Sequence, residues 1–293
     1  MTDSLGTILT AMVTPFDADL RVDHRRLADL ARFLIANGSD GLVVAGTTGE
    51  SPTLTDDEKI AMADTVLAAV GDQCPVVVGT GSNDTAHSIR LTQLAERAGA
   101  HAALVVTPYY NKPPERGIIE HFRAVAGETS LPIIIYNIPG RCVVNLPPEA
   151  LATLSEVENI VAVKQANPDL DETRRLRELC EMGVYAGNDD ILLDVLRLGG
   201  WGGICVASHV VGARLAEMAK LMRAGDEEAA AAIDADLQPL YKTLFVTANP
   251  IPVKTAMNLL GHEVGGLRLP LLPATSVESD IVAAELRRLG LGA

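Results

Sequence analysis

Short apolar runs alternate with longer amphipathic stretches along most of the chain. The apolar runs are rich in β-branched residues and predict eight strands, over residues 8–16, 41–46, 75–79, 102–107, 132–136, 159–164, 183–187 and 203–207. Between them the spacing of apolar residues predicts helices, among them 23–37, 55–70, 84–98, 115–128 and 171–182. Several of these begin at an Asp, Asn or Thr that can cap a helix and end near a glycine.

Continuous apolar strands separated by helices indicate a parallel sheet that is covered on both faces. Eight such units that close on themselves form a (β/α)8 TIM barrel. The alternative is an open, doubly wound sheet, which often carries a GxGxxG turn after its first strand. The first predicted strand here ends in Thr14-Pro15-Phe16, without that turn. The pattern therefore favours the α/β class and a TIM barrel.

The chain after about residue 226 contains only helical patterns. These predict helices over residues 229–245, 252–260 and 275–289, separated by Pro250, Pro252, Pro270 and Pro273. We therefore expect a barrel over residues 1–225 and a C-terminal helical extension over residues 226–293.

The formal net charge is −14, from 38 acidic and 24 basic residues. Nucleic acids and anionic membranes require a basic surface, so neither is an expected partner. No window approaches the roughly 18 uninterrupted apolar residues of a spanning helix, and residues 1–6 do not resemble a signal peptide. The four cysteines are far apart and form no CxxC pair, which is typical of reduced thiols. The sequence thus predicts a cytoplasmic protein.

Catalytic groups of a TIM barrel come from the C-terminal ends of its strands. Lys164 ends the sixth predicted strand, after four apolar residues, and only six of the 24 basic residues are lysines. Loss of hydration there favours the neutral amine, which can attack a carbonyl group and form a Schiff base. The alternative, that Lys164 pairs with a carboxylate at the barrel mouth, stays open at this point.

Four further residues at strand ends have polar side chains suited to the same chemistry. Tyr136 follows three isoleucines and can move protons, although a tyrosine that only packs is the alternative. Thr47 and Thr48 lie in a glycine turn whose amides can approach a carboxylate, but such turns are common. The planar guanidinium group of Arg141 is suited to binding a carboxylate, and the alternative is that Arg141 is an ordinary surface arginine.

The histidines are scattered, without an HxH, HExxH or Ser/His/Asp arrangement, and the chain has no phosphate-binding Walker motif. Asp189 and Asp190 are candidate metal ligands, but they open a predicted helix, where acidic residues act as caps. We therefore expect no metal.

Three features together resemble the dihydrodipicolinate synthase / N-acetylneuraminate lyase family. They are GTTGE at residues 46–50, YNIPGR at residues 136–141 and Lys164 on the sixth strand, and the likeness extends over essentially the whole chain. The resemblance implies a TIM barrel and a class I aldolase-type mechanism without a metal or an organic cofactor. It also implies pyruvate as a substrate and, for the family, a homotetramer.

The resemblance also implies roles for individual residues. Lys164 would form the imine and Tyr136 would donate and accept protons. Tyr136, Thr47 and Tyr110 would form a proton relay, with Tyr110 contributed by a neighbouring subunit. Thr47 and Thr48 would hold the pyruvate carboxylate. The remaining positions that the resemblance assigns are Arg141, for the carboxylate of L-aspartate semialdehyde, and Gly187 and Ile204, which would line the pocket.

GTTGE, Arg141 and the Tyr109-Tyr110-Asn111 segment favour L-aspartate semialdehyde as the second substrate. The alternative within the family is an aldolase for a 2-keto-3-deoxy sugar acid, and a third possibility is a non-catalytic keto-acid sensor. Gln165 departs from the Lys-Glu-Ala sequence that is common in the synthases. Asp56, Lys59 and His87 depart from the lysine-inhibited members, which carry an acidic residue one helical turn after the position of Asn83. Weak or absent inhibition by lysine is therefore expected.

Overall fold

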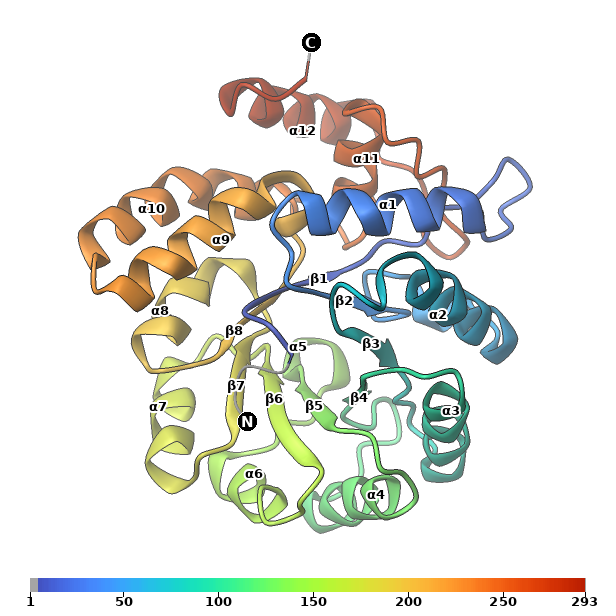
Figure 1. Ribbon diagram of the computed structural model, residues 1–293, viewed down its shortest axis with the longest axis vertical. Coiled ribbons are helices and arrows are strands. Elements are labelled where there is room, and N and C mark those ends of the chain that lie inside the picture. The colour runs from blue at the N-terminus through green and yellow to red at the C-terminus, as the bar shows by residue number, and fades with distance from the viewer. Residues whose placement is uncertain (1–4, 293) are drawn as a thin grey trace.

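The computed structural model describes residues 5–292. Within this range eight parallel strands pair in chain order, and β1 also pairs with β8, so that the sheet closes into a TIM barrel (Figure 1). The strands are β1 (Ile8–Ala11), β2 (Gly41–Val44), β3 (Val76–Gly79), β4 (Ala102–Val106), β5 (Ile133–Asn137), β6 (Ile160–Gln165), β7 (Gly183–Ala186) and β8 (Gly202–Cys205). All eight predicted strands are thereby confirmed.

Helices connect the strands and surround the barrel (Figure 1). They are α1 (His24–Ala36), α2 (Asp56–Val70), α3 (Thr85–Arg97), α4 (Glu115–Gly127), α5 (Pro139–Cys142), α6 (Pro148–Leu154), α7 (Leu170–Leu179), α8 (Leu192–Arg197) and α9 (Ser208–Ala224), with short 3-10 turns η1 (Ser51–Thr53) and η2 (Asp189–Ile191). The side chains of Asp23, Thr55 and Asp84 cap α1, α2 and α3, as the sequence predicted.

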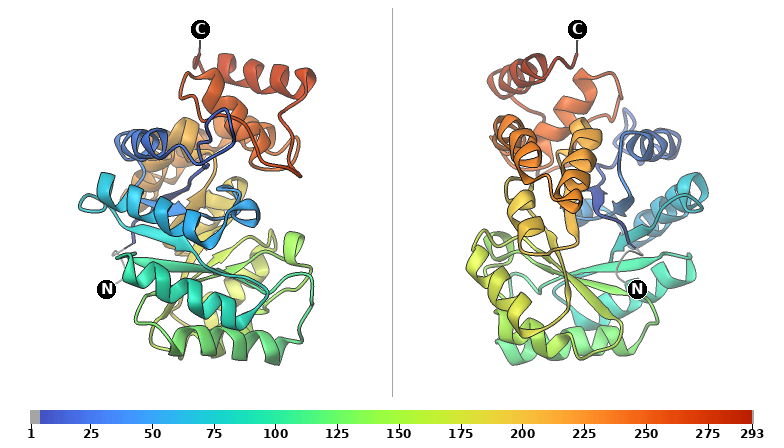
Figure 2. Two further views of the ribbon diagram at one scale, coloured as in Figure 1. Left: turned by 90° about the vertical axis from the view of Figure 1, so that its right-hand side faces the viewer. Right: turned by 60° about the vertical axis from the view of Figure 1, so that its left-hand side comes forward.

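The three predicted C-terminal helices are present as α10 (Glu227–Thr243), α11 (Ile251–Leu259) and α12 (Ser276–Arg288). Helix α10 packs against α9, and α11 packs against α12 and α9. Both views of Figure 2 show α11 and α12 at one end of the molecule. Apolar side chains of α10, α11 and α12 belong to the same hydrophobic core as those of the barrel helices. The division between residues 225 and 226 stays a prediction.

Two apolar layers follow from the alternation of side chains along each strand. One layer fills the space between strands and helices. The other fills the barrel interior, and its members include Leu9, Val43, Val77, Leu104, Ile134, Tyr136, Ala162, Tyr185 and Ile204. Since Lys164 lies two residues after Ala162, it faces the barrel interior as well.

The first strand is shorter than predicted, because the chain leaves the sheet after Ala11. The amide of Val13 donates to Nε2 of His209, 3.1 Å away, and the amide of Phe16 donates to the carbonyl of Val264. These partners are loops and helices rather than neighbouring strands. The seventh helix also ends earlier than predicted, since Cys180 is already extended.

Candidate active site

A cavity of about 810 Å3 opens at the C-terminal ends of β2 to β5. This is the end of a TIM barrel at which active sites lie. The residues that line it include four of the predicted site residues, Thr47, Tyr110, Tyr136 and Arg141. The structure therefore brings predicted residues from three strand ends, those of β2, β4 and β5, to one cavity.

Lys164 and Tyr136 lie side by side inside the barrel mouth. They are register partners on the neighbouring strands β5 and β6, and both side chains point inward. The Nζ atom of Lys164 lies 4.3 Å from the centre of the Tyr136 ring. Both residues are 5% exposed. Lys164 is not itself among the residues that line the mouth cavity, but Tyr136 is, and an amine beside that ring can attack a carbonyl carbon.

Asp189 of η2 and the Cys205 thiol of β8 both interact electrostatically with Lys164. Burial raises the pKa of Asp189, and the hydrogen bonds from the amides of Ala207 and Val206 oppose this more strongly than Lys164 does. Burial also raises the pKa of the Cys205 thiol, with Asp189 as a further cause and Lys164 acting in the opposite direction. No ion pair joins Lys164 to a carboxylate within residues 5–292, which disfavours the interpretation of Lys164 as one half of a salt bridge at the mouth.

Asp189 does not cap the helix that it opens, so that interpretation of the sequence is wrong. Its carboxylate accepts hydrogen bonds from the amides of Val206 and Ala207, at 3.0 Å each. Asp189 thus joins the end of β7 to the start of α9. Carboxylates bind backbone amides at a helix start because these amides have no partner within the helix.

The turn at residues 46–50 is held from two sides. Ala45 and Glu50 have φ angles of 55° and 59°, which non-glycine residues rarely adopt. The amide side chain of Asn249 donates to the Thr48 hydroxyl, 2.9 Å away. The carboxylate of Glu50 accepts from Nζ of Lys254 at 2.9 Å. A strained turn persists only where its surroundings hold it, and here Lys254 of α11 and Asn249, two residues before that helix, supply that support.

Gly187 and Ile204 lie at the ends of β7 and β8. A Cβ atom on Gly187 would lie 2.6 Å from the Cβ of Ala166, so this position requires glycine. The Gly187 amide donates to the carbonyl of Gln165 at 2.8 Å, which fixes β6 against β7. Ile204 is buried in the same interior layer as Tyr136.

Tyr110 and Arg141 are the exposed members of the predicted set. Tyr110 is 89% exposed and has a φ angle of 69°. Arg141 lies on the short helix α5 and is exposed at the cavity mouth. Its guanidinium group makes no hydrogen bond or ion pair within the part of the chain that the structure describes. It is available to a ligand.

Gln165, which departs from the pattern of the synthases, points away from the barrel interior. Its Oε1 atom accepts from the amide of Asn137 at 2.9 Å. Asn137 also bonds to Asn145 and to the backbone of Leu146. The presence of Gln165 in place of the glutamate common in the synthases therefore affects the contacts with Asn137 on the outer side of the sheet, and not the groups that face the cavity.

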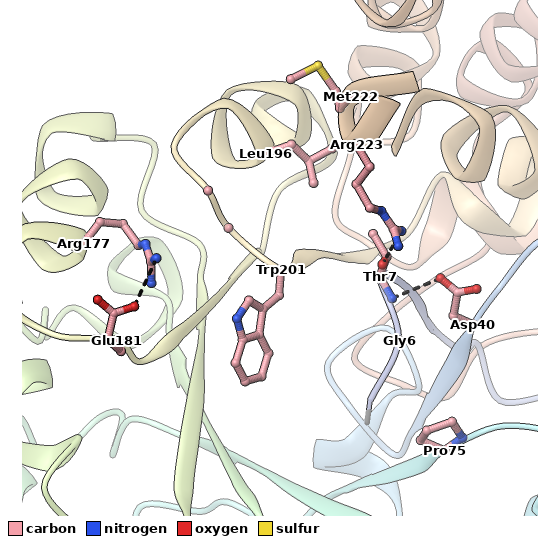
Figure 3. Close-up of a pocket in the computed structure, with 12 residues that line it drawn as sticks. Gly6, Thr7, Asp40, Pro75, Arg177, Glu181, Leu196, Trp201, Met222 and Arg223 are labelled. Atoms are coloured by element: carbon pink, nitrogen blue, oxygen red, sulfur yellow. Dashed lines mark hydrogen bonds and ion pairs between the residues drawn. The ribbon is translucent and has the colours of Figure 1, made fainter. Parts of the chain in front are cut away.

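A second cavity, of about 830 Å3, lies at the opposite end of the barrel (Figure 3). Its charged groups already have partners, as Figure 3 shows. Asp40 accepts from the Thr7 amide at 3.0 Å, and Arg223 donates to the Thr7 hydroxyl at 2.5 Å. Arg177 lies 3.7 Å from Glu181. Residues at this end of a TIM barrel contribute to stability rather than to catalysis.

Asn249 and Lys254 also support the site, although the sequence did not identify them in that role. Both reach the turn at residues 46–50 from about 200 positions away in the chain. The local signal for Lys254 was a lysine that directly follows apolar residues, in Pro252-Val253-Lys254.

Residues 5–292 contain no group of three or more His, Cys, Asp or Glu side chains that could hold a metal ion. In the same range no helix is both long enough and apolar enough to cross a membrane.

Comparison with known proteins gives consistent matches over nearly the full length. The model of the Dihydrodipicolinate synthetase family matches residues 4–289. The 4-hydroxy-tetrahydrodipicolinate synthase of Moorella thermoacetica is 49% identical over 288 residues, which cover 98% of this chain and 99% of the relative. The crystal structure of the dihydrodipicolinate synthase of Cyanidioschyzon merolae with lysine bound has a TM-score of 0.96 at 41% identity and covers 98% of this chain and 99% of that one. A structure described as a monomeric dihydrodipicolinate synthase variant has a TM-score of 0.96 at 40% identity, and the match covers 99% of this chain and 98% of that one.

Proposed function

Because this chain belongs to the dihydrodipicolinate synthetase family, we propose that it is a lyase that condenses pyruvate with L-aspartate 4-semialdehyde to 4-hydroxy-tetrahydrodipicolinate. This reaction belongs to the biosynthesis of diaminopimelate and lysine. The observation that carries the proposal is the buried amine of Lys164 beside Tyr136 at the barrel mouth. A sensor that only binds keto acids needs no such amine.

The first half of the reaction is carried by Lys164. Its amine, once it has lost its proton, adds to C2 of pyruvate, and loss of water leaves an imine. Removal of a proton from the pyruvate methyl group then gives an enamine, which is the carbon nucleophile. Tyr136 donates and accepts these protons, since its ring lies beside Nζ of Lys164.

The second half forms the new carbon–carbon bond. The enamine attacks the aldehyde carbon of the semialdehyde, and the aldehyde oxygen takes up a proton. The amino group of the same substrate then adds to the imine carbon and displaces Lys164. The ring closes and the free lysine is restored. No redox step occurs, so proton transfers and carbonyl additions suffice.

Thr47 and Thr48 hold the pyruvate carboxylate in this proposal. The Thr48 hydroxyl accepts its hydrogen bond from Asn249, which leaves the hydroxyl proton to be donated to a carboxylate oxygen. Arg141 binds the carboxylate of the semialdehyde, because its planar fork lies unpaired at the mouth of the same cavity. Gly187 and Ile204 line the pocket next to Lys164.

Tyr110 completes the proton relay with Tyr136 and Thr47 in a neighbouring subunit. An exposed aromatic ring on a strained backbone is costly unless something binds it, which supports this proposal. We propose a homotetramer as the assembly. Sedimentation equilibrium is the test, since the similar structure of a monomeric variant shows that one fold can occur in different states. A cytoplasmic location stays a prediction.

Weak inhibition by lysine is also part of the proposal. The carboxylate of Asp56 is already bonded to His87, at 2.9 Å, and to Arg90, at 2.9 Å. The Asp56 carboxylate is therefore not free to bind an ammonium group of lysine. Half-inhibition at submillimolar lysine would contradict this expectation.

The test of the proposed function is an assay with pyruvate and L-aspartate semialdehyde on the wild type and three variants. Lys164→Ala should abolish product formation, whereas Lys242→Ala, which removes an exposed lysine, should have no effect. Arg141→Ala should raise KM for the semialdehyde by about tenfold to a hundredfold, since a hydrogen bond to a charged group is lost. Borohydride reduction with pyruvate should label Lys164 in the wild type. A wild type that forms the adduct but never consumes the semialdehyde would leave the Schiff-base chemistry intact and refute the second substrate.

A further inference from the structure

The loop that carries Arg141 closes on the side chain at which it begins. We call residues 138–146 the Arg141 loop, and it leaves β5 directly after Asn137. The amide of Leu146 donates to Oδ1 of Asn137 at 3.1 Å, and the carbonyl of Leu146 accepts from Nδ2 of Asn137 at 3.1 Å. Asn137 is fully buried. One buried side chain thus holds both ends of the loop.

Asn137 also ties the Arg141 loop to the strand of Lys164. Its Nδ2 atom donates to Oε1 of Gln165 at 2.9 Å, and the two residues are register partners on β5 and β6. Gln165 directly follows Lys164, and its side chain points to the opposite face of the sheet. The base of the loop is therefore fixed relative to the strand that bears the amine.

A second anchor joins the loop to α7. The Asn145 side chain accepts from Asn137 at 3.0 Å and donates to the two carboxylate oxygens of Glu172 at 2.9 and 3.2 Å. Glu172 also accepts from the side chain of Asn167, in the segment between β6 and α7, at 2.9 Å. Amide donors bind an ionised carboxylate more strongly than a neutral acceptor. We call this connected set the Asn137 network, and its members are Asn137, Asn145, Gln165 and Glu172.

The far end of the loop has few contacts of its own. The guanidinium group of Arg141 makes no hydrogen bond or ion pair with any residue from 5 to 292. Val143, two residues later, is 66% exposed and has a φ angle of 64°. The position of the guanidinium group therefore depends on how the base of the loop is held.

We propose that Asn145 and Glu172 are positioning residues. Through Asn137 they set the place of Arg141 relative to Lys164, and thereby the affinity for the carboxylate of the second substrate. Neither residue lines the mouth cavity, so an effect on that substrate has to pass through the Arg141 loop. This inference rests on the proposed function, in which Arg141 binds the semialdehyde.

The substitution Asn145→Asp tests the proposal with a minimal change of shape. It keeps the oxygen that accepts from Asn137 but sets a second carboxylate against Glu172, and like charges repel. KM for the semialdehyde should rise by about tenfold, since a displaced guanidinium group loses part of a charge-assisted bond. The value of kcat and KM for pyruvate should stay within about twofold, because Lys164 and Tyr136 are untouched.

The double variant Asn145→Asp/Glu172→Gln is the rescue. It exchanges donor and acceptor, so that one carboxylate again faces one amide. KM for the semialdehyde should return to within about threefold of the wild type. In the Arg141→Ala background, Asn145→Asp should raise this KM by less than about twofold further, because the group through which it acts is absent.

Asn159→Asp is the matched control. Asn159 is half-buried next to the start of β6, at the opposite end of the barrel, and its amide donates to the carbonyls of Ala126 and Thr129 at 3.0 Å each. This variant should lower the urea midpoint of unfolding, but it should change neither KM by more than about twofold. A rise in KM for the semialdehyde in Asn159→Asp would show that general loss of stability causes the effect.

Hydrogen exchange, measured by mass spectrometry on residues 138–146, tests the anchoring without the reaction. Asn145→Asp should speed exchange of this segment, and the double variant should restore its protection. Unchanged exchange in Asn145→Asp would overturn the proposal, and so would faster exchange with an unchanged KM for the semialdehyde. A wild type that consumes no semialdehyde would refute the proposed function, whereas the exchange rates would still support or contradict the anchoring of the loop.

Discussion

The buried ion pair between Lys254 and Glu50 can be broken by the substitution Lys254→Met. The Nζ atom lies 2.9 Å from the Glu50 carboxylate, 2.9 Å from the Thr14 carbonyl and 4.3 Å from the centre of the Phe16 ring. The side chains of Lys254 and Glu50 are 1% and 0% exposed. Methionine has a similar length and volume but no charge and no donor.

The cost of this substitution follows from what it leaves behind. The second oxygen of Glu50 still accepts from the amide of Arg268, at 3.0 Å, but its charge loses the compensating ammonium. Removing one partner of a buried pair destabilises a protein by about 3–5 kcal/mol. Burial lowers the pKa of Lys254, and Glu50 opposes this, so the pair itself is a compromise between desolvation and attraction.

Urea unfolding at one fixed protomer concentration measures the effect, since assembly makes stability depend on concentration. Lys254→Met should lower the free energy of unfolding by about 3–5 kcal/mol. Lys220→Met is the matched control. Lys220 is 79% exposed and lies 3.8 Å from Glu217, so its loss should cost less than about 0.5 kcal/mol.

The double variant Lys254→Met/Glu50→Gln separates the charge from the packing. Because it leaves no unpaired charge, it should recover a large part of the loss, by at least about 1 kcal/mol relative to Lys254→Met. If Lys254→Met unfolds within 1 kcal/mol of the wild type, the argument from an uncompensated carboxylate is wrong. Strict additivity of the two substitutions would refute it equally.

Three further substitutions have defined expectations. Burial lowers the pKa of His209 from 6.5 to about 4, so its contribution to stability is complete above pH 6.5 and is lost as the pH falls toward 4. The loss of stability amounts to about 2 kcal/mol between pH 7 and pH 5, and urea unfolding of His209→Gln should show a correspondingly weaker dependence on pH. Gly187→Ala places a Cβ atom 2.6 Å from that of Ala166, so it should lower the free energy of unfolding by about 1–3 kcal/mol and lower kcat. Gly127→Ala, with open space around it, should leave both the unfolding free energy and kcat unchanged. Lys59→Met removes an unpaired buried charge and should raise the free energy of unfolding by about 1 kcal/mol, and a loss of stability would show that Lys59 has a partner in the assembly.

The barrel could be predicted from the sequence because its signals are local. Strands such as β3 and β5 are continuous apolar runs, as a sheet covered on both faces requires. Helix starts such as Thr55 of α2 carry a capping box within four residues. The end of β1 could not be predicted in the same way. Residues 12–16 are mostly apolar, but the amides of Val13 and Phe16 bond to His209 and Val264, which are distant in the chain.

The positions of the site residues were predictable for a related reason. A strand end gives both a place in the barrel and, by alternation, a direction, so that Lys164 and Tyr136 could be expected to meet. The supports of the site were not predictable. Asp189 was assigned to its own helix, yet it binds the amides of Val206 and Ala207, because a carboxylate at a β-strand end can reach the next loop as well as its own.

The C-terminal extension is therefore part of the site and does not merely cover the barrel. Asn249 and Lys254 lie five residues apart, at the start of α11, and bond to Thr48 and Glu50 of one turn. That turn contains two residues with positive φ angles at or next to its ends, a conformation that its own sequence disfavours. Hydrogen bonds from Asn249 and Lys254 supply what the turn lacks, and the bond from Asn249 fixes the Thr48 hydroxyl. The barrel positions Lys164 through its strands, whereas the extension positions the proposed carboxylate-binding group, so both parts of the chain are needed to bring a keto acid to the amine.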